Sequence, residues 1–202
     1  MLVNLIQAIA MLKAGEVVAI PTETVYGLAA DATNESALRQ IYAVKQRPAD
    51  NPLIVHIGDM AQVLDWVAEF SLLAQKLAHA FWPGPFTLVL PALNSVSAIV
   101  RANEPTVALR VPSHALTLQL LKESGLALAA PSANKYTQLS PTTAAHVAAG
   151  LGDKIAVLDG GACQVGIEST IVSVAGDSWQ LLRQFMITPR QVSNIFKCIG
   201  IM

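Results

Sequence analysis

Residues 16–30 read EVVAIPTETVYGLAA, and this stretch indicates the fold class. Glu16–Ile20 is a short, mostly apolar run, which is typical of a β-strand covered on both faces. The run ends at Pro21, and the polar segment Thr22–Thr24 follows it directly. Ligands of α/β sheets usually bind beyond the ends of strands. The stretch therefore predicts a buried sheet and a candidate site at its edge.

The same alternation continues outward along the chain. Asn34 is a candidate N-cap, Asp59-x-x-Gln62 resembles a capping box, and Gly15 and Gly125 follow helical runs. Because the elements alternate without a linker or repeat, we expect one α/β domain over residues 1–202. Helices are predicted over residues 2–14, 34–45, 59–82 and 113–124, and starting at Ser140-Pro141 and Thr188. Further strands are predicted at residues 53–57, 86–90, 107–111, 126–130, 155–158, 170–174 and 180–183.

The composition narrows the class of protein. Hydrophobic residues make up 53% and charged residues 13% of the 202, so either a membrane protein or a doubly covered sheet is indicated. No apolar run reaches the roughly 18 residues of a membrane span, and Met1–Leu12 lacks the features of a signal peptide. The net charge of −1 argues against an electrostatic nucleic-acid binder. Cys163 and Cys198 have no metal-site spacing, so we expect a reducing cytoplasm and no protein-held metal.

Polar residues are scarce, and several follow the predicted strands. Lys45 and Arg47 form either a solvated surface pair or a phosphate contact. Arg110, within the apolar run VALRV, must be paired structurally or directed into a cleft, and the two are about equally plausible. His56 alone is more often a core histidine than a ligand. Ser132 is followed by Ala133 and Asn134, and such residues also form ordinary turns.

Several well-known motifs are missing from the sequence. A Gly-x-Ser-x-Gly elbow is absent, so Ser169 has no support as a hydrolase nucleophile. Neither a Walker loop nor a Gly-x-Gly-x-x-Gly fingerprint is present, so any ATP must be bound in another way.

A series of short motifs carries a family resemblance. Each is weak alone, but together they keep the family's order between about Glu16 and Arg183. The chain resembles the YrdC/TsaC-like family of threonylcarbamoyl-AMP synthases. The stretches are PTETVYGLAADA, the Lys-x-Arg of KQRPADNPLIVHI, WPGPFTLVL, TVALRVPSH, APSAN, SPTTAAHV and LDGGACQVGIESTIVSV.

The resemblance implies a fold and a reaction. The fold is α/β, a YrdC-like twisted mixed sheet with surrounding helices and a large concave cleft. In the reaction, threonine and bicarbonate give a carbamate, which attacks the α-phosphate of ATP and releases pyrophosphate. Mg²⁺ is expected on the phosphates, and a transferase complex would pass the threonylcarbamoyl group to tRNA. The alternatives are a non-catalytic RNA-binding module and a carbamoyl-transfer domain like those of hydrogenase maturation proteins.

The resemblance also assigns residues, one motif position at a time. Lys45 and Arg47 would be catalytic and, like the other ATP-side residues, would hold ATP. The implied threonine contacts are Thr24, Tyr26, His56, Arg110, Ala130 and Ser169. The remaining ATP contacts are Asn51, Thr106, Ser132, Asn134, Ser140 and Arg183.

The chain departs from the family pattern in places. Lys135–Gln138 stands where the family has a turn containing Ser-Gly, and Gln184–Met186 stands where Pro-Gly often follows Arg183. The sequence ends at Met202, so we expect any lid over the cleft to come from its own termini or from a partner.

Overall fold

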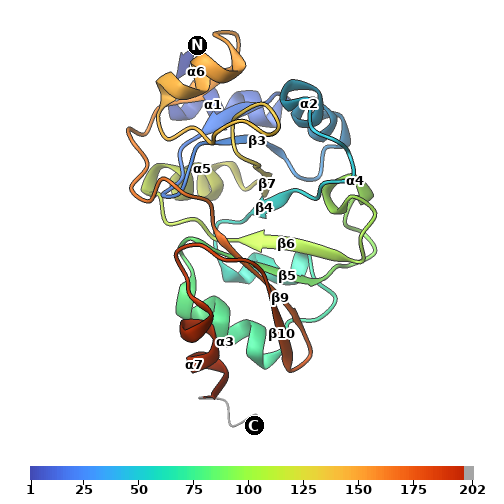
Figure 1. The fold of residues 1–202 in the computed structure, drawn as a ribbon. Coiled ribbons are helices and arrows are strands. Elements are labelled where there is room, and N and C mark those ends of the chain that lie inside the picture. Colours follow the sequence, from blue (N-terminus) through green and yellow to red (C-terminus); the bar gives the residue numbers. More distant parts are fainter. Residues whose placement is uncertain (198–202) are drawn as a thin grey trace.

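The computed structural model describes residues 1–197. Within them the strands form one ten-stranded sheet in the order β1-β8-β2-β3-β7-β4-β6-β5-β9-β10 (Figure 1). The strands are β1 (Leu2–Val3), β2 (Val18–Ile20), β3 (Gly27–Asp31), β4 (Ile54–His56), β5 (Phe86–Pro91), β6 (Thr106–Arg110), β7 (Leu128–Ala129), β8 (Ala156–Leu158), β9 (Thr170–Ala175) and β10 (Ser178–Arg183). The helices are α1 (Leu5–Lys13), α2 (Glu35–Lys45), η1 (Met60–Asp65, a 3-10 helix), α3 (Leu72–Phe81), α4 (Ala98–Arg101), α5 (Ala115–Ser124), α6 (Ala144–Leu151) and α7 (Pro189–Lys197).

The sheet is mixed, and its central strands position the candidate site. β4 and β6 run parallel, and their register places His56 directly beside Arg110. β5 pairs antiparallel with β6 and parallel with β9, so Thr170 lies opposite Phe86. His56 and Arg110, which are far apart in sequence, are therefore neighbours in the middle of the sheet.

Both faces of the sheet are covered, as the apolar runs predict. Along β2, Val18 and Ile20 join one hydrophobic cluster and Ala19 joins the other. Leu120 of α5 belongs to the cluster of Val18, whereas Leu38 of α2 belongs to that of Ala19. Successive side chains of a strand point to opposite faces, so two packed layers follow from this alternation. The expected α/β class with a twisted mixed sheet is confirmed.

The helix predicted over residues 59–82 is wrong as one element. Asp59 does cap a helix, but that helix is the short η1, and α3 starts anew after Ser71. Between them the backbone N–H of Ala68 donates to Pro91 O (2.9 Å), and Val67 bridges Ala92. Pairing with the end of β5 therefore replaces helical hydrogen bonds in this segment.

The helix start predicted at Ser140-Pro141 is also wrong. α6 begins later, with Thr143 as its N-cap accepting from the backbone N–H of His146. Pro141 O instead accepts from Tyr26 N (2.8 Å). This bond holds the segment beside the end of residues 21–24, which we call the PTET loop.

Two strands were not predicted. Residues 2–3 form β1 before the helix, and Asn4 then caps α1. Gly27–Asp31 forms β3, although its alanines carry little intrinsic strand preference, because it is paired on both sides by β2 and β7. No helix of residues 1–197 is long and apolar enough to cross a membrane.

Candidate functional site

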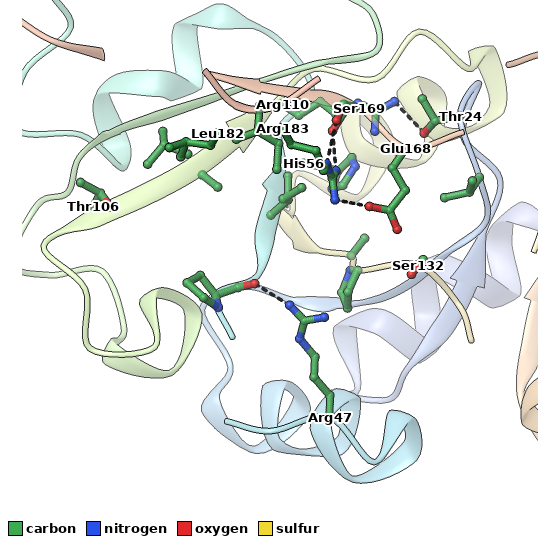
Figure 2. Close-up of a pocket in the computed structure, with 18 of the residues that line it drawn as sticks. Thr24, Arg47, His56, Thr106, Arg110, Ser132, Glu168, Ser169, Leu182 and Arg183 are labelled. Carbon is green, nitrogen blue, oxygen red and sulfur yellow. Dashed lines mark hydrogen bonds and ion pairs between the residues drawn. The ribbon is translucent and has the colours of Figure 1, made fainter. Parts of the chain in front are cut away.

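A pocket of about 470 Å³ lies over one face of the central strands, because alternate residues of β4 and β6 line it. Its volume lies within the ~300–1,000 Å³ typical of small-molecule sites. Its walls come from the PTET loop, the turn after α2, strands β4, β5, β6, β9 and β10, and the segment after β7. The expected site residues that line it are Thr24, Arg47, His56, Thr106, Arg110, Ala130, Ser132, Ser169 and Arg183 (Figure 2).

Arg110 is held by a buried network at one end of the pocket. Its Nη2 donates to Glu23 Oε1 (2.6 Å) and to Thr24 Oγ1 (3.0 Å), and its Nε donates to Gly84 O (3.1 Å). Arg110 and Glu23 are each only 4% exposed. The two alternatives left open by the sequence therefore coincide, because the guanidinium is ion-paired and also lines the pocket.

The Thr22 and Thr24 hydroxyls have defined hydrogen-bond directions. Thr22 Oγ1 donates its single hydrogen to Val25 O (2.6 Å). In the 2.8 Å contact between the two hydroxyls, Thr24 must therefore be the donor. Thr24 Oγ1 also accepts from Arg110, so its remaining capacity is one lone pair. A ligand group that meets Thr24 Oγ1 must donate a hydrogen to it.

His56 is a buried, neutral side chain beside Arg110. Burial, helped by the nearby Arg110 charge, lowers its pKa to about 3. Its Nδ1 is buried and has no hydrogen-bond partner within residues 1–197. A buried polar atom without a partner is costly, but this nitrogen is also shielded from solvent, so it does not face the open pocket.

Ser169, directly before β9, lies near Arg110 and Arg183 and also lines the pocket (Figure 2). Its Oγ is 2.8 Å from Thr87 Oγ1, and its carbonyl accepts from Arg183 Nε (3.0 Å). Arg183 also pairs with Glu168, whose other carboxylate oxygen accepts from Ser140 Oγ (3.1 Å). Burial lowers the pKa of Arg183, while the Glu168 charge acts against this.

Arg47 approaches the pocket from the side opposite Arg183 and Glu168 (Figure 2). Its Nη2 donates to Pro52 O (3.1 Å), and its guanidinium lies 5.8 Å from the centre of the Tyr136 ring. Its Nε is buried without a partner in the described part of the chain, and no carboxylate there forms an ion pair with it. Arg47 therefore offers the pocket an uncompensated positive charge.

Comparison with known proteins identifies the family. The model of the Sua5/YciO/YrdC family, described as telomere recombination, matches residues 10–184. The chain belongs to the Sua5/YciO/YrdC family. It is 49% identical to the threonylcarbamoyl-AMP synthase of Bacillus subtilis over 94% of this chain and 55% of that protein. It is 45% identical to that of Pyrococcus abyssi over 83% of this chain and 49% of that protein.

A solved structure of the family agrees with this assignment. P. abyssi Sua5 complexed with L-threonine matches with a TM-score of 0.93 and 38% identity, over 96% of this chain and 60% of that one. The chain thus spans about half the length of these two relatives.

Lys45, of the family's Lys-x-Arg element, does not lie on the pocket surface. It is only 1% exposed, so the expectation of an accessible charge at the cleft edge is wrong. Its Nζ donates to Ser132 O and to Asn134 O (2.6 Å for the latter). Burial, helped by the Arg47 charge, lowers its pKa to about 8.

Four other residues with implied roles lie outside the pocket lining. The Tyr26 hydroxyl lies within hydrogen-bonding distance of Asp159 Oδ1 (3.0 Å) and Gly161 O (2.8 Å), and burial raises its pKa to about 12. Asn134 Nδ2 donates to two nearby carbonyls, and Asn51 Nδ2 donates to Asp50. Ser140 reaches the pocket only through Glu168. Cys198 lies outside the described residues.

The family motifs contain further pocket residues that the sequence analysis did not single out. Glu168 lines the pocket, and Glu23 lies directly behind Arg110. The signal in the sequence was an acidic residue inside each of the motifs PTETVYG and GIESTIV. A carboxylate beside buried, apolar strands needs a partner, and the two carboxylates pair with Arg110 and Arg183.

Proposed function

We propose that this protein is an L-threonylcarbamoyladenylate synthase. It converts L-threonine, bicarbonate and ATP into threonylcarbamoyl-AMP and pyrophosphate. The observation that carries the proposal is one pocket with two chemically distinct ends. One end holds Thr24, His56 and Arg110, and the other holds Arg47 and Ser132.

The first end fits an amino acid. Arg110 has two N–H groups, both on Nη1, that no described residue engages, and these suit a carboxylate. Thr24 Oγ1 can only accept from a ligand, so a substrate hydroxyl fits it as a donor. His56 stays neutral at physiological pH, so it binds through hydrogen bonds without repelling the substrate ammonium.

The second end fits a triphosphate. Arg47 has no carboxylate partner in the described residues, so anionic phosphates are drawn to it more strongly than to either paired arginine. Ser132 follows β7 and adds a hydroxyl to the same wall. Arg183 lies beside Arg110 and His56, across the pocket from Arg47 (Figure 2), where it can stabilise charge on the α-phosphate once phosphate oxygens compete with Glu168.

The reaction then requires alignment more than a protein nucleophile. The threonine amine and bicarbonate form a carbamate and water. A carbamate oxygen bonds to the α-phosphorus of ATP as the bond to pyrophosphate breaks. The arginines hold and neutralise the phosphates during this step, which is the main protein contribution in phosphoryl-type transfers.

We further propose that magnesium accompanies ATP. Within residues 1–197 no three His, Cys, Asp or Glu side chains gather as a metal cage. Two carboxylates line the pocket: Glu104 is exposed, and Glu168 is already bonded to Ser140 and Arg183. These residues fit a magnesium ion held by phosphate oxygens and water. When bound, the ion would neutralise phosphate charge. Synthesis should therefore require magnesium and resist a zinc-selective chelator.

The product would serve tRNA modification. We propose that a threonylcarbamoyl transferase complex takes the adenylate and that the protein works in the cytoplasm. The similarity to threonylcarbamoyl-AMP synthases supports this placement.

The decisive experiment incubates the protein with ATP, magnesium, L-threonine and labelled bicarbonate. The expected products are a labelled threonylcarbamoyl adenylate and pyrophosphate, both absent when threonine is omitted. If neither product forms while the protein retards tRNA in a gel, the RNA-binding module is the better description.

A further inference from the structure

We propose that Glu23 is a positioning residue that sets the amino-acid end of the pocket through Arg110. The inference rests on the proposed function, because it concerns how the carboxylate of the amino-acid substrate is recognised. Glu23 is buried behind Arg110 and is not among the residues that line the pocket.

Both oxygens of the Glu23 carboxylate are fixed. Oε1 accepts from Arg110 Nη2 at 2.6 Å, and Oε2 accepts from the backbone N–H of Ser113 at 3.1 Å. The Glu23 backbone is tied as well, since its carbonyl accepts from Val165 N (2.8 Å). The carboxylate is therefore held between the PTET loop and the turn after β6, and it has little freedom to follow a ligand.

The bonds to Arg110 leave one side of its guanidinium open. Of its five N–H donors, Nε uses one on Gly84 O, and Nη2 uses two on Glu23 and Thr24. The two N–H groups of Nη1 have no protein partner within residues 1–197. The guanidinium is planar, so fixing Nε and Nη2 also fixes the direction of Nη1. Glu23 thus determines where a substrate carboxylate can be bound.

The same contact controls the acceptor on Thr24. Arg110 Nη2 donates to Thr24 Oγ1 in the orientation that the bonds to Glu23 and Gly84 O fix. If the guanidinium turns, Thr24 loses the donor that occupies one of its lone pairs. Glu23 therefore affects both the carboxylate contact and the contact expected for the substrate hydroxyl.

The test compares L-threonine with L-threoninamide, which has the same side chain but no carboxylate. Calorimetry measures the Kd of each ligand for the wild-type protein and for Glu23→Gln. Wild-type protein should bind threonine about tenfold or more tightly than threoninamide, because the bond to a charged carboxylate is lost in the amide. In Glu23→Gln this ratio should fall to within about threefold, because a small misplacement removes most of the benefit. The ratio is insensitive to the fraction of folded protein.

Further variants separate positioning from general damage. In an Arg110→Gln background, adding Glu23→Gln should leave the ratio unchanged, since Glu23 acts through Arg110. Glu35→Gln is the matched control, because it removes a carboxylate from the exposed Arg39 pair and should keep the wild-type ratio. If Glu23→Gln does not fold, Glu23→Asp keeps the charge but shortens the side chain, and its ratio should fall below that of wild type.

The outcomes are distinguishable. A wild-type ratio in Glu23→Gln, or in Glu23→Asp where that variant is used, overturns the inference and leaves the proposed function intact. An equal change in the Arg110→Gln background also overturns it. If wild-type protein binds neither ligand, the proposed substrate is wrong and the inference fails with it.

Discussion

Replacing Lys45 with methionine tests whether a buried ammonium positions the phosphate end of the pocket. Methionine keeps a similar length and removes the charge. Lys45 Nζ holds the carbonyls of Ser132 and Asn134, and its only hydrogen-bond partners in the described residues are these carbonyls. Without the ammonium, both carbonyls lose a charged donor and the Ser132 segment is released. We expect adenylate synthesis by Lys45→Met to fall about tenfold or more, with a higher KM for ATP.

The stability of the same variant should depend on pH in a defined direction. The pKa of Lys45 falls from 10.5 to about 8 on folding, chiefly because burial disfavours the charged form. Between these pH values the unfolded chain binds the proton and the folded protein does not, so the free energy of unfolding rises with pH. Relative to Lys45→Met, wild-type protein should gain about 3 kcal/mol across this window.

Urea unfolding of both proteins at several pH values between 7.5 and 10 measures this difference. Other groups that titrate in the range are present in both proteins, and their contributions cancel. A constant difference between the two proteins at every pH would show that Lys45 keeps its ordinary pKa, and the buried position would then be wrong. Full activity of Lys45→Met would remove this side chain from the phosphate end altogether.

Three further results are expected. Arg47→Ala should lower synthesis by a factor that corresponds to about 2 kcal/mol or more, because a charge-assisted phosphate contact is lost. Its unfolding curve should stay unchanged. A normal kcat/KM for ATP would refute this. Valine should be rejected by about 10⁴-fold or more relative to threonine, because it cannot donate to Thr24 Oγ1, and serine should be rejected less, by roughly 1–3 kcal/mol; equal adenylate formation with valine would refute the pocket. Thr137 has φ of 68°, a strained value for a β-branched residue. Thr137→Gly should therefore raise the free energy of unfolding by about 1 kcal/mol, and Thr137→Ala should not. Equal urea midpoints for Thr137→Gly and wild type would refute this.

Local signals made most of the elements predictable. Asn34 caps α2 as expected, with its side chain accepting from Ala37 N, and Gly125 ends α5 in the left-handed conformation. Such signals depend on a few adjacent residues. The apolar runs likewise became strands, because only a doubly covered sheet buries them fully.

Contacts between residues far apart in the sequence could not be predicted from local sequence signals. The contact between His56 and Arg110 depends on β4 and β6 being parallel neighbours in one register. The contact between Arg110 and Glu23 joins residues 87 positions apart. Composition showed that an arginine in an apolar strand needs a partner, but only the sheet order shows which carboxylate supplies it. The family resemblance assigned most of the polar residues that line the pocket, because it carries information about the whole fold.

The Lys-x-Arg element shows why spacing alone did not separate a pocket residue from a buried one. Lys45 is the last residue of α2, and Gln46 then adopts the left-handed conformation, with φ of 52° and ψ of 39°. That conformation turns the chain at the end of the helix. Lys45 therefore keeps the inward direction of the last helical turn, whereas Arg47 lies beyond the turn and points into the pocket. Glycine is the usual sign of such a turn, and glutamine gives none. The two cations look equivalent in sequence but have different roles: Arg47 faces the ligand, and Lys45 holds the segment that contains Ser132.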